Sequence, residues 1–280
     1  MANASALPPE QRLDGPEGLK LAYRKWLPAG SPRAAIVIVP GFNSHSGLYN
    51  WAAHQLVGLG IATYAIDLRG RGASDGERFY VASIDDYAKD IDVLMRLVRS
   101  ELAGRPVFLL GHSAGGVTSV IYTLDHQSQL AGLICESFAY HVPAPDIVIA
   151  ALKGLSRLLP HARVLTLNNR DFSRDPEVVA AMNADPLIAQ ETQPAQTLAA
   201  LAVANERLKR SLGEIRLPVL ILHGTADKAT KPSGSREFFE RAGSADKTLK
   251  LYEGGYHDLL NDTIRPQVFS DIADWLNARL

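Results

Sequence analysis

The sequence predicts an α/β fold in which a mostly parallel central sheet is flanked by helices. Two observations support this fold class. Apolar runs alternate with segments of helical periodicity along most of the 280 residues, and such alternation is typical of strand–helix–strand units. Several of the runs are also apolar at every position, as expected for strands that are buried on both faces of a sheet.

The first half of the chain carries the clearest elements. Residues 34–39 form an unbroken run of alanine, isoleucine and valine that ends at Pro40-Gly41. Ser83 and Asp86 have the spacing of a capping box, and apolar residues then recur at helical spacing as far as Val98. We expect strands at residues 34–39, 61–66 and 106–110, and helices at about 48–59, 84–98 and 114–125.

The second half repeats the pattern after an interruption. We expect strands at residues 130–135, 219–222 and 248–252, and helices at about 236–242 and 264–280. Between residues 138 and 205, prolines separate short amphipathic pieces, and no strong strand signal is present. This composition is not that of a flexible linker. We therefore expect a helical cap at 138–205, inserted into a core formed by residues 1–137 and 206–280.

Charge and composition argue against several kinds of partner. Lysine and arginine number 29 against 30 aspartates and glutamates, and a formal net charge of -1 gives no electrostatic reason to expect nucleic acid or an anionic membrane. The first ten residues lack the basic and apolar regions of a signal peptide, and the longest apolar stretch, 147–152, is too short to span a bilayer. We expect a cytoplasmic protein whose single cysteine, Cys135, is a buried thiol.

A nucleophile motif lies between the strand at 106–110 and the helix that follows it. Residues 111–115 read Gly-His-Ser-Ala-Gly and match G-x-S-x-G. A serine at a strand-to-helix junction lies in a sharp turn that projects its hydroxyl above the sheet edge, and the flanking glycines avoid collisions in the bend. A chance glycine-rich turn is the alternative. Because the strand and the helix are both in place, we interpret Ser113 as a nucleophile.

A serine hydroxyl needs a base and an orienting acid near neutral pH. In this arrangement the chain order is serine, then acid, then histidine. Asp227 follows the strand at 219–222, and His257 follows the strand at 248–252. The loops at the carboxyl ends of parallel strands meet at one edge of the sheet. We therefore predict a catalytic set of Ser113, Asp227 and His257.

Other acidic residues and histidines fit these roles less well. Asp246 precedes its strand and is expected at the wrong end of the sheet, and Asp258 adjoins the histidine and should point elsewhere. His223 precedes the acid, so we expect a structural role for it. His45 and His112 are expected near the site without acting as the base.

The same geometry predicts an oxyanion hole. Acyl transfer places negative charge on the carbonyl oxygen, where fixed N–H donors stabilise it by several kcal/mol. One donor should be the N–H of Ala114. The second should come from the loop at 40–43, and Phe42 is the residue we expect to supply it.

No cofactor or metal site is expected. The glycine-rich segment 70–76 has no helix directly after it, and its spacing does not fit a dinucleotide-binding loop. Residues 111–116 lack the lysine of a phosphate-binding loop, and no cluster of cysteine, histidine and aspartate has metal-ligand spacing.

Several segments together resemble the monoacylglycerol lipase/lysophospholipase branch of the α/β-hydrolases, which is also catalogued as serine aminopeptidase S33-like. They are 41–49, 67–76 (Asp-Leu-Arg-Gly-Arg-Gly-Ala-Ser-Asp-Gly), 111–116, 183–186, 223–227 (His-Gly-Thr-Ala-Asp) and 246–257. The similarity runs from about Gly18 to the C-terminus. It implies an α/β-hydrolase fold, a helical cap that admits an acyl chain, and hydrolysis of small acyl esters without a cofactor.

The chain also departs from this branch. Its oxyanion loop begins with Pro40-Gly41, where the family usually has His-Gly, and Phe42 is bulkier than the small residue common there. Glyceride-cleaving relatives often carry an acidic residue and an arginine in the next turn, where this chain has Ser44 and Leu48. The expected polar contacts to a glycerol headgroup are therefore missing.

We expect a serine esterase that cleaves monoacylglycerol-like or lysophospholipid-like esters through an acyl-enzyme. An acyltransferase or an aminopeptidase-type acyl hydrolase would use the same residues, and a non-catalytic ligand-binding homologue would keep only the pocket. The expected partner is a small acyl ester, with transient lipid-surface contact through the cap. Apolar cap residues either pack on the core, which we expect for about two-thirds of them, or line an acyl tunnel or a lipid-facing surface. They are Ile147, Ile149, Ala150, Leu152 and Leu155.

Overall fold

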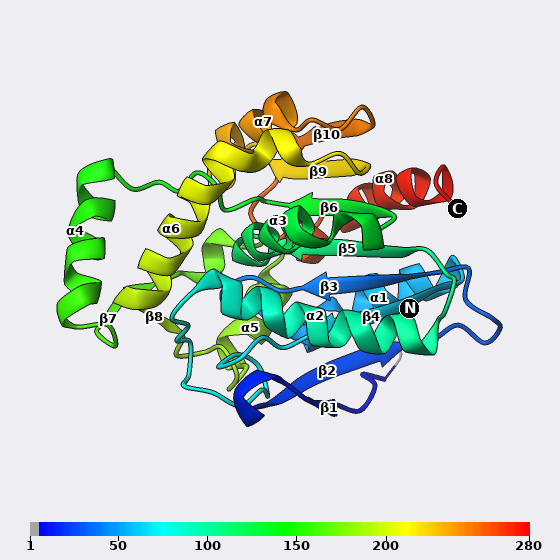
Figure 1. Ribbon diagram of the computed structural model, residues 1–280, viewed down its shortest axis with the longest axis horizontal. Helices are drawn as coiled ribbons and strands as arrows, with labels where there is room; N and C mark the ends of the chain where they lie inside the picture. Colours follow the sequence, from blue (N-terminus) through cyan, green and yellow to red (C-terminus); the bar gives the residue numbers. More distant parts are fainter. Residues whose placement is uncertain (1–5) are drawn as a thin grey trace.

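An eight-stranded sheet forms the centre of the computed structural model, which describes residues 6–280 (Figure 1). Part of the N-terminal segment that we tested for a signal peptide, residues 1–5, lies outside the described residues. In spatial order the strands are β1 (Gln11–Asp14), β2 (Lys20–Trp26), β4 (Ile61–Ile66), β3 (Ala34–Val39), β5 (Val107–His112), β6 (Gly132–Glu136), β9 (Val219–Gly224) and β10 (Lys247–Tyr252). β1 and β2 are antiparallel to their neighbours, and all other pairs are parallel.

Helices cover both faces of this sheet. On one face the core contains side chains of α2 (Ile84–Glu101), α3 (Ala114–His126), α6 (Ala195–Ser211) and α7 (Pro232–Arg241). On the other face it contains α1 (Asn50–Gly58) and α8 (Arg265–Asn277). Short 3-10 helices are η1 (Pro16–Gly18), η2 (Ser46–Tyr49), η3 (Gln127–Gln129), η4 (Asn169–Asp171), η5 (Leu212–Glu214) and η6 (Leu259–Asn261).

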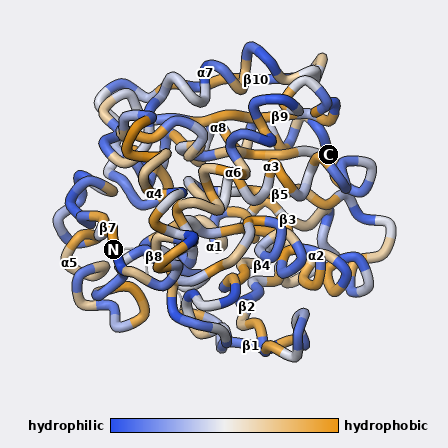
Figure 2. Tube along the Cα trace, turned by 60° about the vertical axis from the view of Figure 1, so that its left-hand side comes forward, coloured by the Kyte–Doolittle hydropathy of each residue, from blue (hydrophilic) through white to orange (hydrophobic). Residues whose placement is uncertain are grey.

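The uninterrupted apolar strands have the expected physical cause. Successive side chains of a strand point to opposite faces of the sheet. In β3, Ala35, Val37 and Val39 lie in one core, and the alternate residues lie in the other. Figure 2 shows the hydrophobic residues gathered along these central strands. The prediction of a mostly parallel sheet flanked by helices is confirmed, and Cys135 is a buried free thiol as expected.

Two antiparallel strands were missing from the sequence interpretation. β1 and β2 extend the sheet at the edge beyond β4. β2 has the sequence Lys-Leu-Ala-Tyr-Arg-Lys-Trp, and its charged residues are half-buried or exposed. This pattern is neither continuously apolar nor strictly alternating, so the sequence carries neither of the two patterns that indicate a strand.

The segment between β6 and β9 contains more than helices. It comprises α4 (Asp146–Leu158), β7 (Arg163–Thr166), α5 (Pro176–Ala184), β8 (Thr192–Pro194) and α6. The expectation that it lacks strands was wrong, because β7 and β8 pair as a two-stranded antiparallel sheet. All four residues of β7 are exposed, so no apolar alternation marked it. Figure 1 shows α4, β7 and β8 beyond the ends of β3, β5 and β6.

α6 joins this segment to the core. It continues past residue 205 to Ser211, and Ala200, Leu201, Ala204 and Leu208 are buried in the same core as α2 and α3. Among the helices of residues 6–280, none is long and apolar enough to cross a membrane.

Candidate active site

Ser113 occupies a strained turn between β5 and α3. Its backbone has φ 56° and ψ -120°, a conformation that costs a non-glycine residue free energy and persists only where the surrounding structure enforces it. A Cβ on Gly111 would lie 2.6 Å from the Gly115 oxygen, and a Cβ on Gly115 would lie 2.2 Å from the Val39 oxygen. Both glycines are therefore required sterically, and the segment has the geometry of a nucleophile elbow.

His257 and Asp227 come together from the loops after β10 and β9. His257 Nδ1 lies 2.8 Å from Asp227 Oδ2. The other oxygen of this carboxylate accepts hydrogen bonds from the N–H groups of Ala229 at 2.8 Å and Thr230 at 2.9 Å. Burial acts to raise the pKa of Asp227, but the charges and hydrogen bonds of His257 and His223 outweigh it and leave the pKa below its ordinary value. An ionised carboxylate requires Nδ1 of His257 to be the protonated nitrogen, which leaves Nε2 available as a base.

The contact between the serine and the histidine is not formed. Within residues 6–280, the side chain of His257 bonds only to Asp227 and Thr230, and no hydrogen bond joins it to the Ser113 hydroxyl. The two groups nevertheless belong to one cluster, because the ring of His112, the residue before the serine, lies 4.8 Å from the ring of His257. Such contacts often tighten only when substrate binds. The catalytic role of Ser113 therefore stays a prediction.

The residues expected at the oxyanion hole lie beside the elbow. Phe42 and Ala114 are 5% and 4% exposed. Neither of their N–H groups donates to an acceptor within the described chain. A Cβ on Gly41 would lie 2.7 Å from the Ser113 Cβ, so the loop approaches the serine as closely as a glycine allows. The guanidinium of Arg71 covers the Phe42 ring at 4.2 Å and holds this loop in place.

The rival residues have structural contacts. His223 lies 2.7 Å from the Ser235 hydroxyl and 3.1 Å from the Asp227 carboxylate. His45 caps η2 and lies 2.7 Å from Asp185, so it connects the oxyanion loop to the inserted segment. Asp246 pairs with Arg279 of the chain's last turn. The contacts of His223 agree with the structural role that we expected for it.

Phe172 and Arg71 were absent from the predicted site. Phe172 is buried and packs edge-on against the His257 ring at 4.9 Å, and its carbonyl accepts the Asp258 N–H at 2.8 Å. Arg71 is buried and pairs with Glu191 of the inserted segment. The glycine-rich segment that contains Arg71 was singled out in the sequence, but the residue's partner lies 120 positions away.

A separate cluster of buried residues offers the nitrogen and oxygen atoms that could bind a metal ion. His112, Glu136 and Asp258 are buried, and one ligand atom from each lies within 4.8 Å of the others. Sequence spacing could not reveal this cluster, because its members come from three separate elements. Burial, followed by the charge of His257, lowers the pKa of His112 to about 3, so this histidine is neutral near pH 7.

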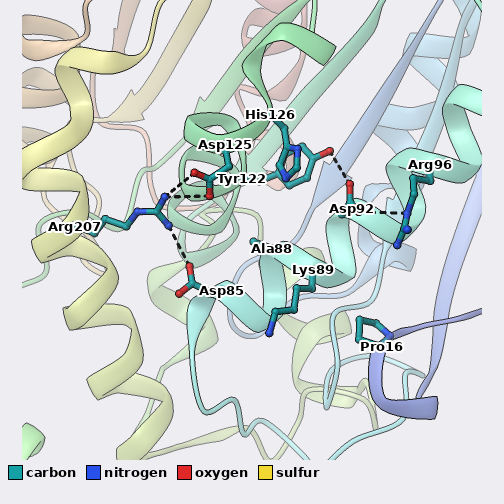
Figure 3. A pocket seen from close by; sticks show the side chains of 10 residues that line it. All are labelled: Pro16, Asp85, Ala88, Lys89, Asp92, Arg96, Tyr122, Asp125, His126 and Arg207. Atoms are coloured by element: carbon teal, nitrogen blue, oxygen red, sulfur yellow. Dashed lines mark hydrogen bonds and ion pairs between the residues drawn. The ribbon is translucent and has the colours of Figure 1, made fainter.

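A surface hollow of about 450 Å³ lies between α2, α3 and α6 (Figure 3). Its acidic and basic groups pair with one another, as Arg207 does with Asp85 and Asp125. It is lined by Pro16, Asp85, Ala88, Lys89, Asp92, Arg96, Tyr122, Asp125, His126 and Arg207, and none of these belongs to the predicted catalytic set. The chemistry is therefore expected at the elbow.

The fold and the site together define the α/β-hydrolase class: a mostly parallel sheet, an elbow after β5, and an acid and a histidine after two later strands. A sequence profile of the serine aminopeptidase S33 family matches residues 30–264. The chain belongs to this family and is a hydrolase.

Three similar proteins illustrate the relationship. A monoacylglycerol lipase of Mycolicibacterium smegmatis is 30% identical, over 97% of this chain and 98% of its own length. The monoglyceride lipase of Homo sapiens is 33% identical, over 94% of this chain and 88% of its own length. The crystal structure of a monoacylglycerol lipase of Paleococcus ferrophilus is 31% identical and superposes with a TM-score of 0.83, covering 93% of this chain and 99% of that one.

Proposed function

We propose that this chain is a serine esterase that cleaves monoacylglycerol-like or lysophospholipid-like esters. The Ser113 hydroxyl attacks the acyl carbonyl and gives its proton to Nε2 of His257, while Asp227 orients the imidazole. The N–H groups of Phe42 and Ala114 stabilise the oxyanion. The alcohol leaves with the proton from His257, and water, activated by the same histidine, then hydrolyses the acyl-enzyme.

One observation carries this proposal: the strained turn at Ser113 lies in the same cluster as an imidazole that is held by an ionised carboxylate. Structural requirements alone do not explain a serine at positive φ, because glycine would relieve the strain. The unused N–H groups of Phe42 and Ala114 give the same small region two donors for an oxyanion.

The relatives named as monoacylglycerol lipases support an acyl ester as the substrate. This chain differs in the turn that would face a headgroup. Leu48 packs against a small apolar cluster that contains Phe172, Met182 and Ile188, and Ser44 is buried. We therefore infer that the acyl chain contributes more to recognition than the headgroup does.

We propose residues 138–205 as the cap of this enzyme, with lipid-surface contact through α4. Ile147 and Leu158 are 78% and 82% exposed, which is unusual for large apolar side chains. Ile149, Leu152 and Leu155, in contrast, are half-buried on the helix that packs against α6. This division supports packing for three of the five apolar residues considered above. We propose a cytoplasmic location for this activity.

A fluorophosphonate probe tests the nucleophile. Wild type should be labelled and should hydrolyse p-nitrophenyl and monoacylglycerol esters, and Ser113→Ala should do neither. Ser119→Ala is the matched control, because Ser119 is a buried serine of α3 that does not belong to the predicted catalytic set. Labelling that survives Ser113→Ala contradicts the assignment. A series of acyl lengths tests the substrate class, since indifference to length argues against an acyl-binding cap.

Two other functions each have one supporting observation. The family description favours an aminopeptidase, and products formed from aminoacyl anilides would reveal this activity. An acyltransferase would use the same acyl-enzyme, and products formed with added alcohols would reveal it. The missing contact between Ser113 and His257 favours a ligand-binding homologue without turnover. Steady-state ester hydrolysis above the Ser113→Ala background excludes the second of these.

A further inference from the structure

A second surface hollow, of about 490 Å³, lies where the inserted segment meets the core. Arg78 and Phe79 line it from the core segment between β4 and α2. Arg163 of β7 and Thr192 of β8 line it from the inserted segment. The remaining lining residues are Pro186, Ala189 and Gln190. Two arginine side chains from distant parts of the sequence therefore meet in one hollow.

Neither arginine has an acidic partner within residues 6–280. The side chain of Arg78 donates to the backbone carbonyls of Gly72 at 2.8 Å and Leu187 at 2.7 Å. The side chain of Arg163 donates to the backbone carbonyl of Thr192 at 3.0 Å. Carbonyl oxygens fix the position of a guanidinium group but do not neutralise its charge. Since a guanidinium has five N–H donors, each of these two groups keeps donors for a further ligand.

The carboxylates whose charges act on Arg78 are engaged elsewhere. Glu191 pairs with the buried Arg71, and both oxygens of Asp67 accept backbone N–H groups. Burial lowers the pKa of Arg78; the charge of Glu191 opposes this effect, and the charges of Arg71 and Arg163 add to it. An anion in the hollow would supply the negative charge that this guanidinium group lacks.

Phe79 brings the two guanidinium groups to one aromatic ring. The guanidinium carbons of Arg78 and Arg163 lie 4.6 Å and 5.7 Å from the centroid of this ring, which attracts both cations. The Phe79 backbone has φ 66°, a strained conformation for a bulky residue. Its N–H donates to the Gly70 carbonyl at 2.8 Å, and its own carbonyl accepts the Thr197 hydroxyl at 3.0 Å. A glycine would relieve the strain but would remove the ring between the arginines.

We propose that this hollow binds a phosphate group through the side chains of Arg78 and Arg163, which Phe79 holds together. The planar N–H groups of guanidinium match the oxygens of a phosphate, and two arginines without acidic partners compensate two negative charges. Arg78 belongs to the core and Arg163 to the inserted segment, so a bound phosphate links these two parts of the chain. This binding site goes beyond the proposed ester hydrolysis and does not depend on Ser113.

Two sources offer this chemistry: a soluble phosphate compound and the headgroup of a phospholipid. Val164 and Leu165 directly follow Arg163 in β7 and are 40% and 39% exposed. A phospholipid offers acyl chains to such apolar side chains and a phosphate to the arginines, whereas a soluble phosphate compound offers only the charged group. Binding to soluble phosphates and binding to vesicles therefore distinguish the two sources.

Binding is measured in the Ser113→Ala background, so that added lipid esters are not hydrolysed. Calorimetry measures the affinity for inorganic phosphate and for glycerol 3-phosphate, and co-sedimentation measures binding to phosphatidylcholine vesicles with and without phosphatidic acid. We expect Arg78→Gln and Arg163→Gln each to weaken phosphate-dependent binding at least about ten-fold, as for the loss of hydrogen bonds to a charged group. Arg210→Gln is the matched control, because Arg210 is an exposed arginine of α6 outside the hollow. Its binding should equal that of the background.

Two results support the proposal and identify the source. Binding of either soluble phosphate that requires both arginines indicates a soluble ligand, and binding only to vesicles with phosphatidic acid, with the same requirement, indicates a lipid headgroup. The proposal is overturned if neither kind of binding occurs, if Arg163→Gln binds as the background does, or if Arg210→Gln loses as much affinity as Arg163→Gln. If Arg78→Gln does not fold, Arg163→Gln decides, because the Arg163 side chain is exposed.

Discussion

Replacing Asp227 by asparagine tests the proposed chemistry most directly. Oδ1 of this residue accepts hydrogen bonds from the N–H groups of Ala229 and Thr230. An asparagine must therefore place its side-chain oxygen at the position of Oδ1. Its NH₂ group then takes the place of Oδ2 and faces His257 Nδ1, which lies 2.8 Å from that atom. The amide donates to Nδ1 and forces the ring proton onto Nε2. In this tautomer the histidine cannot accept the Ser113 proton.

The expected loss in kcat is about 10⁴-fold, which corresponds to about 5 kcal/mol of transition-state stabilisation. Steady-state hydrolysis of a p-nitrophenyl ester measures it, and thermal unfolding confirms that the variant is folded. KM should change little, because the side chain of Asp227 is buried and is not expected to contact substrate.

Thr230→Val is the comparison for this experiment. The Thr230 hydroxyl donates to the same carboxylate oxygen at 2.7 Å, but its loss leaves the charge and the tautomer unchanged. We expect a loss of at most about ten-fold, as for one hydrogen bond. If Asp227→Asn loses no more than Thr230→Val, the carboxylate does not orient the base and the reasoning is refuted.

Three further predictions concern the loop, the buried histidine and the cap. Gly41→Ala should lower kcat about 100-fold by displacing the oxyanion loop, because its Cβ would lie 2.9 Å from the backbone oxygen of His112; kinetics of Gly58→Ala, where a Cβ meets nothing within 4 Å, provide the control. Burial lowers the pKa of His112 in the folded chain to about 3. Between this pKa and the pKa of the same side chain in the unfolded chain, the unfolded chain binds more protons, so the free energy of unfolding falls as the pH falls. For an unfolded pKa of about 6.5, His112 should account for a loss of about 2 kcal/mol in the free energy of unfolding between pH 7 and pH 5. Urea unfolding of His112→Gln should show that this part of the loss is absent, and an unchanged pH dependence would contradict the prediction. Arg71→Met should cost about 3–5 kcal/mol by leaving the buried Glu191 unpaired, and adding Glu191→Leu should recover most of it in the same assay; no recovery would show that the pair is not the cause.

The strands of the core were predictable because burial on both faces of the sheet produces a continuous apolar run in the sequence. Each strand predicted from an apolar run overlaps an observed strand, as residues 106–110 overlap Val107–His112. Four strands were missed, β1, β2, β7 and β8; β2 carries charged residues, and all residues of β7 are exposed. Their pairing depends on a neighbouring strand that already exists, and a single sequence window does not contain that information.

The residues of the candidate site also differ in whether the sequence could predict them. Ser113, Asp227 and His257 were predicted because chemical type, chain order and position after a strand all coincide, and the structure brings the latter two into contact. Phe172 and Glu136 carry no such local signal. Phe172 belongs to an irregular loop of the inserted segment, and Glu136 resembles any charged residue at the end of a strand.

The sequence by itself determined the class of fold, the turn that presents the serine, and the types of residue available for acyl transfer, because each depends on contacts within one strand–loop–helix unit. Only the tertiary structure decided which buried groups surround that chemistry. It placed Phe172 on the His257 ring and enclosed His112, Glu136 and Asp258 together. Proton positions in such a cluster depend on removal from water and on charges a few ångströms away, and both arise only when distant segments pack.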